Sequence, residues 1–366
     1  MRGVQRCNCG HGATVAATLK DVAAHAGVSI KTVSNVVHDH PRVAVQTRER
    51  VRAAIEALNY RPNLSARHLR KARVGVLALA IPDLANTYFS DIGNAVIAAA
   101  AAHSYTVLLD HTGGDRGNEI LVVNGLRPHL IDGVILSPLA LEMDDLWPNH
   151  VGVPIVLLGE QLFSAPWDHI VIDNVAAARA ATAHLLRLGR RRIAAIGVRE
   201  ASTGETARLR LHGYAEALAE AGRAVDPHLL APVKSFHRAD GARAMRQLLA
   251  LDHPPDAVFC FNDLLALGAM RALHEAGCHV PDDVAVVGFD DIEEGRFATP
   301  TLTTISPDKE EIGRVAVSLL LERSRGTRTG PPECIEPPFR LIVRESTAGT
   351  HYAASNRSAY CRGHDR

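Results

Sequence analysis

The chain has 366 residues, 47% of them hydrophobic and 22% charged, which is typical of a soluble globular protein with two or three domains. The formal net charge is zero, but residues 1–73 contain 13 Lys or Arg against 4 Asp or Glu, so the remainder carries the compensating negative charge. A basic first fifth joined to an acidic body predicts an anionic partner for one end only. A basic tail without a partner is the alternative.

The cysteines are too scattered for a disulfide scaffold, which favours a reducing compartment. Residues 1–17 are expected to be a disordered leader. Within them Cys7, Cys9 and His11 could bind a metal ion, but no second ligand pair accompanies them, so we expect neither a metal nor another cofactor. The leader lacks an apolar core of signal-peptide length, and Ala95–Ala102 is too short to span a bilayer. These features predict a cytoplasmic protein.

The stretch LKDVAAHAGVSIKTVSNVV, residues 19–37, predicts two short helices separated by a tight turn. Asp21 can cap or charge the first helix, and Gly27 permits the left-handed backbone that ends it. Ser29 can then begin the second helix, which exposes short hydrogen-bonding side chains of the kind that read base edges in the DNA major groove. An αα-hairpin that binds no nucleic acid is the alternative.

Two further segments complete the basic region. A third amphipathic helix is predicted over 47–60, where Val51, Ile55 and Leu58 share one side and would close a three-helix core. Residues 61–73, RPNLSARHLRKAR, predict either a short helix that starts after the proline or a plain basic linker.

From residue 74 onward, apolar strand-like runs alternate with helical stretches. The runs are VGVLALAI, YTVLLD, DGVILS, VPIVLLG, RIAAIGV, DAVFCF and DVAVVGFD. Apolar strands that are separated by helices predict parallel sheets covered on both faces. A region of about 270 residues is too long for one small sheet, so two α/β lobes are expected. Ligands bind at the carboxyl ends of such strands, which predicts a cleft between the lobes.

TLKDVAAHAGVSIKTVSNVV and VAVQTRERVRAAIEALNYRPN resemble the N-terminal domain of the lactose/galactose repressor family of bacterial transcription regulators. The resemblance continues in order through IPDLANTYFSDI, IDGVILSP, IDNVAAARAATAHLLRLGRRRIAAIG, RLHGYAEALAEAG, DAVFCFNDLLALGAMRALHEAGCHVPDDVAVVGFDDIE, TPTLTTI and RLIVREST. It implies an all-α helix–turn–helix DNA-binding domain, a hinge helix, and an α/β core of two parallel-sheet lobes like that of periplasmic sugar-binding proteins.

The expected domains follow from this resemblance. They are a leader over 1–17, the DNA-binding domain over 18–62, the hinge over 63–73, the core over 74–349 and a tail over 350–366. Within the core, the first lobe is expected over about 74–172 and 304–334, and the second over about 173–303 and 335–349.

The resemblance assigns DNA contacts to the helix–turn–helix and the hinge, at Thr18, Ser29, Ile30, Lys31, Thr32, Ser34, Asn35, His38, Arg42, Asn63, Ala66, Leu69 and Arg70. In the family the hinge helix forms only on the operator, where a leucine wedges into the minor groove; here that residue is Leu69. Apolar wedges unstack a base step, and a helix of about ten residues is too short to be stable alone. Many relatives carry an aromatic residue or proline in place of Ile30 and an arginine in place of Asn35. The operator is therefore expected to differ, because asparagine favours adenine where arginine favours guanine.

Between the lobes the resemblance implies a small-molecule effector, a sugar first and a nucleoside second, bound by Tyr88, Phe89, Ser137, Thr206, Arg210, Phe236, Asn262 and Asp290. Aromatic faces stack on rings, and arginine and aspartate bond vicinal hydroxyls. The residues alone leave alternatives open. Arg210 and Asp290 could form a structural ion pair, Phe236 could belong to the core, and Asp263 is expected to cap a helix rather than bind a ligand.

One departure from the family concerns the pocket. Many relatives carry a carboxylate after the run that matches VPIVLLG, where this chain has Gly159 followed by Glu160. The hydroxyl contact of that carboxylate is therefore not expected at Gly159.

We expect no enzymatic activity, because no GxGxxG, GxxxxGK[ST], HExxH or GxSxG string occurs. A small-molecule binding protein without a regulatory role is the rival hypothesis, and it predicts a signal peptide and no basic helical block. We therefore expect a repressor that acts at the nucleoid and binds a palindromic operator as a homodimer or a dimer of dimers. The tail after Thr350 shows no leucine heptads, which favours the dimer.

Overall fold

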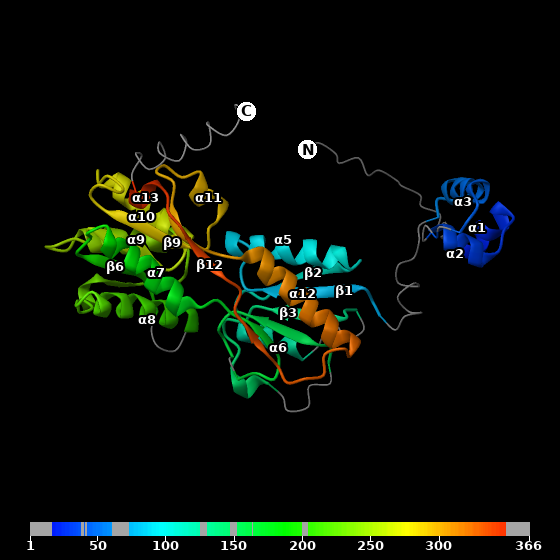
Figure 1. The fold of residues 1–366 in the computed structure, drawn as a ribbon, viewed down its shortest axis with the longest axis horizontal. Helices are drawn as coiled ribbons and strands as arrows, with labels where there is room; N and C mark the ends of the chain where they lie inside the picture. Colours follow the sequence, from blue (N-terminus) through cyan, green and yellow to red (C-terminus); the bar gives the residue numbers. More distant parts are fainter. Residues whose placement is uncertain are drawn as a thin grey trace, which may run out of the picture. The chain divides into compact units, whose positions relative to one another are not determined.

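The computed structural model describes residues 17–37, 40, 42–60, 73–124, 130–146, 152–162, 164–199 and 204–348. The chain divides into two compact units, residues 1–73 and residues 74–366, which are described separately (Figure 1). Among the described residues, no helix is both long enough and apolar enough to cross a membrane.

The first unit contains helices α1 (Leu19–Ala26), α2 (Ile30–Val37) and α3 (Val45–Ala57). Thr18 begins α1 in a capping box: its hydroxyl accepts a hydrogen bond from the Asp21 amide, and its own amide donates to the Asp21 carboxylate at 2.9 Å. The predicted stop and restart are confirmed. Gly27 has φ +63° and ends α1, and the Thr32 amide donates to Ser29 Oγ at 3.1 Å.

The three helices enclose a small apolar core. Val22, Val33 and Val51, one from each helix, are fully buried, and Ile55 and Leu58 pack against them. The third helix begins at Val45, before its predicted start at residue 47. The predicted hinge helix, together with His38, Asn63, Ala66, Leu69 and Arg70, lies outside the described residues, as do most of the leader and the tail.

The second unit is built on two six-stranded sheets. The first sheet is parallel throughout and has the order β11 (Cys334–Ile335), β5 (Asp168–Ile170), β4 (Ile155–Leu158), β3 (Gly133–Leu136), β1 (Val76–Ile81) and β2 (Thr106–His111). The second has the order β12 (Phe339–Ile342), β10 (Thr303–Pro307), β9 (Ala285–Phe289), β8 (Ala257–Cys260), β6 (Ile193–Val198) and β7 (Leu230–Pro232). Its last strand, β12, runs antiparallel to β10, so this sheet is mixed rather than parallel as predicted.

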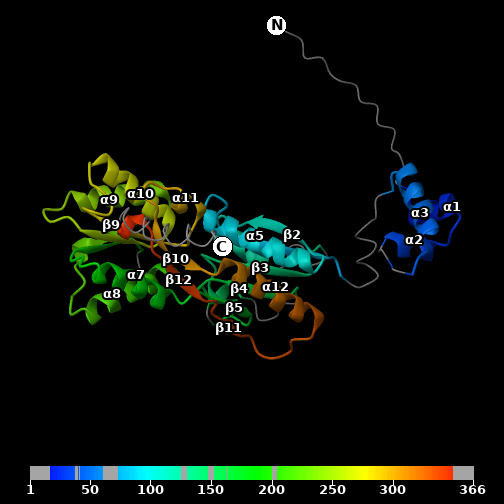
Figure 2. The same cartoon turned by 45° about the horizontal axis from the view of Figure 1, so that its top comes forward.

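Helices cover these sheets in two lobes (Figures 1 and 2). The first lobe contains α5 (Thr87–Ala102), α6 (Arg116–Val123), α12 (Lys309–Arg325) and the 3₁₀ turn η1 (Met143–Asp145). The second contains α7 (Asn174–Arg187), α8 (Glu205–Glu220), η2 (Pro227–Leu229), α9 (Arg238–Leu249), α10 (Asp263–Glu275), α11 (Glu293–Arg296) and α13 (Glu345–Ala348). The backbones of helices α9 and α10 are in contact. Gly241 and Gly268 permit this contact, because a Cβ atom at either position would overlap a carbonyl oxygen of the facing helix.

The chain passes between the sheets three times, after β5, after β10 and after β11. Strand β10 belongs to the second sheet, so the second crossing lies after Pro307 and not at the predicted boundary between 303 and 304. All seven predicted runs contain strands. Every strand that they omit is short or belongs to the C-terminal part of the core, where pairing with distant residues defines it.

Candidate functional site

In the first unit, α2 presents the predicted base-reading face. Val33 and Val36 are buried against the other helices, while Ile30 is 46% exposed and Lys31 is exposed. Thr32, Ser34 and Asn35 are half-buried. Thr18 and Ser29 are exposed as well as being helix caps, and Arg42 is exposed in the turn before α3. Their role in DNA binding stays a prediction.

In the second unit, a cavity of about 490 Å³ opens between the lobes and brings together all eight residues that the resemblance assigned to an effector. From the first lobe come Tyr88, Phe89 and Ser137, and from the second come Thr206, Arg210, Phe236, Asn262 and Asp290. The volume lies in the range of small-molecule sites. That these residues bind an effector remains a prediction.

Aromatic side chains form part of the wall. Tyr88 and Phe89 stand at the start of α5, which the Asn86 side chain caps, and their rings meet edge to face with centroids 5.3 Å apart. Burial raises the pKa of the Tyr88 hydroxyl. Phe236 is half-buried, lines the cavity and lies under the Arg199 guanidinium, whose carbon is 5.5 Å from the ring centre.

Arg210 is a buried cation, only 5% exposed. Its Nε donates to Asn174 Oδ1 at 2.7 Å, its Nη1 donates to the Phe261 carbonyl oxygen, and its guanidinium lies 3.5 Å over the Phe289 ring. Burial lowers the pKa of Arg210, and the Asp290 and Glu160 carboxylates oppose that shift. Arg210 and Asp290, both described, form no direct ion pair.

Asp290 follows β9 in a left-handed backbone conformation, with φ +113°. Its amide donates to the Ile305 carbonyl oxygen at 2.8 Å, which holds the turn against β10. The side chain is buried and lines the cavity. Burial raises the pKa of Asp290 to about 7, against the opposing charges of Arg210 and Lys309.

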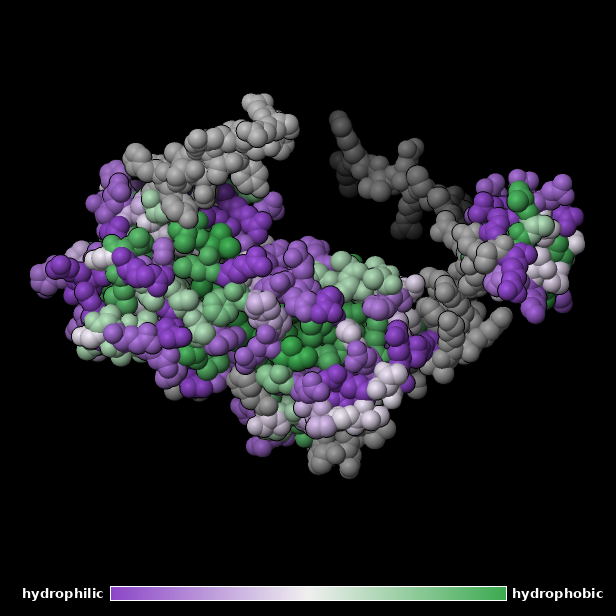
Figure 3. Space-filling view, viewed as in Figure 1, coloured by the Kyte–Doolittle hydropathy of each residue, from purple (hydrophilic) through white to green (hydrophobic). Residues whose placement is uncertain are grey.

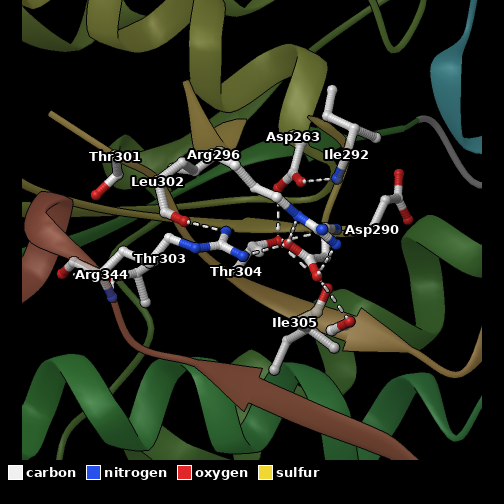
Figure 4. A network of polar contacts seen from close by, with 12 residues as sticks. Asp263, Asp290, Ile292, Arg296, Thr301, Leu302, Thr303, Thr304, Ile305 and Arg344 are labelled. Carbon is white, nitrogen blue, oxygen red and sulfur yellow. Dashed lines mark hydrogen bonds and ion pairs between the residues drawn. The ribbon is translucent and has the colours of Figure 1, made fainter. Parts of the chain in front are cut away.

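The neighbouring Asp291 bonds to a different set of side chains, as expected for adjacent residues at a strand end, which point to opposite faces. Two of its partners, Arg344 and Arg296, are drawn in Figure 4. Its carboxylate accepts hydrogen bonds from Arg344 Nη2 at 2.5 Å, Arg296 Nη2 at 2.8 Å and Ser306 Oγ at 3.0 Å. Burial raises the pKa of Asp291, but these partners lower it by more, so it lies below its usual value. Figure 4 shows the Asp290 carboxyl directed away from both guanidinium groups.

Replacing Asp291 with asparagine is expected to lower the free energy of unfolding by roughly 3 kcal/mol, because it leaves two guanidinium groups without their anion. Its folded pKa is depressed, so the wild-type advantage is present above the unfolded pKa near 3.8 and lost as pH falls below it. Urea unfolding at pH 7 measures the difference. Asp282→Asn, at an exposed position, is the control, and equal midpoints for Asp291→Asn and wild type would contradict the expectation.

The capping prediction for Asp263 was wrong. Asn262 is the N-cap of α10, with its Oδ1 accepting from the Leu265 amide at 2.9 Å, and its Nδ2 donates to the Phe236 carbonyl oxygen. Asp263 is instead a buried anchor that accepts from the Ile292 amide and lies 2.6 Å from Thr304 Oγ1. Burial and the nearby Asp290 raise its pKa well above the usual value.

The cavity also contains polar residues that the sequence analysis did not assign to it. Glu160 and Arg199 line it, and at its edge Asp83 from the first lobe faces His237 from the second, with 3.3 Å between Oδ2 and Nε2. Asn174 lies behind the wall and holds Arg210. Among the described residues no group of acidic, histidine or cysteine side chains could hold a metal ion.

Comparison with known proteins bears on both units. Residues 18–63 match the family described as "Bacterial regulatory proteins, lacI family", and residues 182–347 match the "Periplasmic binding protein-like domain". The HTH-type transcriptional repressor CytR of Escherichia coli K12 is 34% identical over 335 residues, which cover 91% of this chain and 96% of that protein.

Two solved structures extend the match over nearly the full length. The lac repressor dimer bound to operator and the anti-inducer ONPF is 30% identical, with a TM-score of 0.76 over 91% of this chain and 100% of that chain. The transcriptional regulator CelR–cellobiose complex is 34% identical, with a TM-score of 0.66 over 90% of this chain and 99% of that chain. The chain therefore belongs to the lacI family of bacterial regulatory proteins and is a DNA-binding transcriptional regulator.

Proposed function

We propose that this regulator is a repressor whose affinity for its operator changes when a polyhydroxylated small molecule, most directly a sugar, binds between the two lobes. One observation carries the proposal: Arg210, Asp290 and the aromatic residues all line the same cavity between the two lobes. The relative whose structure was solved as a complex with cellobiose supports a sugar. As a DNA-binding regulator the protein would act in the cytoplasm, at the nucleoid.

The polar groups of the cavity suit vicinal hydroxyls. Arg210 donates hydrogen bonds from Nε and Nη1, and no hydrogen bond from another described residue reaches its Nη2 or the Asp290 carboxyl oxygens. One hydroxyl can therefore donate to Asp290 while its neighbour accepts from Arg210. The exposed face of Phe236 could stack on a sugar ring or on a nucleobase, so a nucleoside is the second candidate.

We further propose that the active species is a homodimer that reads a palindromic operator, since two-fold symmetry in the protein requires it in the DNA. The relative that binds operator as a dimer supports this. Several large apolar side chains are exposed on α5, β2 and α6, and a second copy could cover them: Ile97, Leu108, Leu109 and Leu121. In the view of Figure 3, apolar surface gathers over α5.

Fluorescence anisotropy with the DNA upstream of its own gene and of neighbouring genes tests the proposal. We expect binding that weakens steeply with salt and that changes when a sugar from a thermal-shift screen is added. Coupling is reciprocal, so the operator must alter sugar affinity by the same factor. Binding without a palindromic preference, or without any response to a stabilising sugar, would refute it.

Two substitutions on α2 should separate base reading from phosphate contact. Lys31→Ala is expected to weaken binding similarly for all DNA sequences and to reduce the slope of log affinity against log salt by about one. Asn35→Ala is expected to cost roughly 1–3 kcal/mol and to relax specificity at one base pair. Anisotropy on an operator library measures both effects, and Lys20→Ala, exposed on α1, is the control. Indistinguishable specificity profiles for the two variants would contradict this division.

A further inference from the structure

Glu160 is a buried carboxylate in the wall of the cavity, 5% exposed. It follows β4 of the first lobe, and the residue before it, Gly159, has φ +92°. The left-handed turn at Gly159 permits the chain to leave the strand abruptly, so that the next side chain enters the cavity wall.

The carboxylate of Glu160 is bonded mainly to the second lobe. Its Oε1 accepts from Asn174 Nδ2 at 2.6 Å and from the Ile172 amide at 3.3 Å, and its Oε2 accepts from the Thr206 hydroxyl at 2.6 Å. Asn174 begins α7 and Thr206 belongs to α8, both helices of the second lobe. One side chain of the first lobe is thus tied to two helices of the other.

Asn174 extends this tie to the buried cation. Its Nδ2 donates to Glu160, and its Oδ1 accepts from Arg210 Nε at 2.7 Å. The amide cannot turn over without placing its nitrogen against the Arg210 donor and its oxygen against the Glu160 carboxylate. Asn174 Nδ2 also donates to the Ile172 carbonyl oxygen at 3.0 Å, so Glu160 and this carbonyl together select the amide orientation that holds Arg210 in place.

The same contact fixes the hydrogen-bond polarity of Thr206. A hydroxyl has one hydrogen, and that of Thr206 is donated to Glu160. Toward the cavity Thr206 can then only accept, so a ligand group that faces it must be a donor such as a hydroxyl or an amine.

We propose that Glu160 is an interlobe positioning residue, which couples the approach of the two lobes to the orientation of Arg210 and Thr206. The influence of Glu160 on ligand choice rests on the proposed function, whereas its hydrogen bonds to Asn174 and Thr206 of the second lobe do not depend on it. Alanine at this position removes three accepted hydrogen bonds. Glutamine can still accept the two at Oε1 and can donate from Nε2 to the Thr206 hydroxyl in place of the third, so the two variants separate the loss of these contacts from the loss of charge.

Hydrogen–deuterium exchange of the full-length, ligand-free protein tests the tie. We expect Glu160→Ala to speed the exchange of amides in 172–176 and 204–210 by about fivefold or more, and Glu160→Gln to restore most of the protection. Exchange in α12 should stay as in wild type, and Glu336→Ala, at an exposed position, should change nothing. Unchanged exchange in 204–210, or an equal rise in every segment, would overturn the proposal; the latter would mean that Glu160 only stabilises the fold.

A ligand experiment then separates this inference from the proposed function. Wild type and both variants are screened by thermal shift with D-ribose, cellobiose, cytidine and adenosine. For any compound that stabilises wild type, Glu160→Ala should weaken binding roughly tenfold or more, as expected when Arg210 and Thr206 lose their fixed positions. Equal affinity in wild type and Glu160→Ala would overturn the positioning role. If none of the four compounds stabilises wild type, the proposed effector class fails, and the exchange measurement still decides whether Glu160 ties the lobes.

Discussion

Asp290→Asn is expected to weaken effector binding at least tenfold while it stabilises the ligand-free protein at alkaline pH. The carboxylate faces the cavity and can accept hydrogen bonds from a ligand. A hydrogen bond to a charged group contributes roughly 1.5–3 kcal/mol, so the loss of one or two predicts a fall in affinity of at least tenfold. Titration calorimetry with a compound found by thermal shift measures this loss.

The stabilisation follows from the pKa of Asp290, which burial raises to about 7 from its ordinary value of 3.8. Because the folded pKa is higher than the unfolded one, the stabilising protonated form is fully present below pH 3.8, and its contribution is lost as pH rises through 7. At about 1.4 kcal/mol per pKa unit, the variant should gain up to roughly 4 kcal/mol over wild type by pH 8 and far less at pH 5.

Urea unfolding at pH 5 and pH 8 tests this dependence, with Asp252→Asn, at an exposed position, as the control. The same titration should weaken effector binding to wild type as pH falls below 7, because the protonated carboxyl is a poorer acceptor. If the stability difference between Asp290→Asn and wild type does not grow with pH, then ionisation of the buried Asp290 carboxyl does not destabilise the ligand-free protein.

Arg210→Met should cost more than any other substitution in the cavity wall. It leaves the Asn174 Oδ1 and the Phe261 carbonyl oxygen without their donor and removes the cation between Asp290 and Glu160. Removing one member of a buried charged network costs roughly 3–5 kcal/mol. We therefore expect a large loss of stability in urea, together with loss of effector binding.

Arg208→Met is the matched control, since Arg208 lies on the same helix and its side chain is 64% exposed in an i,i+3 pair with Glu205. Such exposed pairs contribute little, so its unfolding midpoint should stay close to that of wild type. Arg210→Lys should be intermediate, because it keeps the charge but not the planar fork that reaches both acceptors. If Arg210→Met unfolds with the Arg208→Met midpoint, the buried network is not a source of stability.

Local patterns in the sequence were enough for much of this fold. The stop at Gly27 and the restart at Ser29 depend on neighbours within a few residues, and the seven apolar runs are continuous in the chain. Strand β5 was missed because it is only three residues long, and β11 because it exists only through its partner: Cys334 and Ile335 pair with His169 and Ile170. Such pairings across more than a hundred residues leave no periodic signal.

The candidate site, like the fold, could be predicted only in part from the sequence. The resemblance named the eight residues that share the cavity, but it could not show what each side chain already contacts. Asn262 caps a helix, and Asp263, expected as that cap, is an anchor beneath β9 and β10. In the sequence, Glu160 stands out only as the neighbour of Gly159. Its importance depends on the distances to Asn174 and Thr206, which no spacing along the chain encodes.

The three crossings between the sheets affect how the protein is made. The first lobe needs α12 and β11, whose residues are synthesised after those of most of the second lobe. Until they leave the ribosome, Gly133 lacks the Leu320 side chain that packs on it, and α5 lacks its partner helix. The helix–turn–helix unit, complete within the first 60 residues, can fold during translation, whereas the core must wait for nearly the whole chain. Translation that stops early would therefore yield a folded DNA-binding domain joined to an incomplete core.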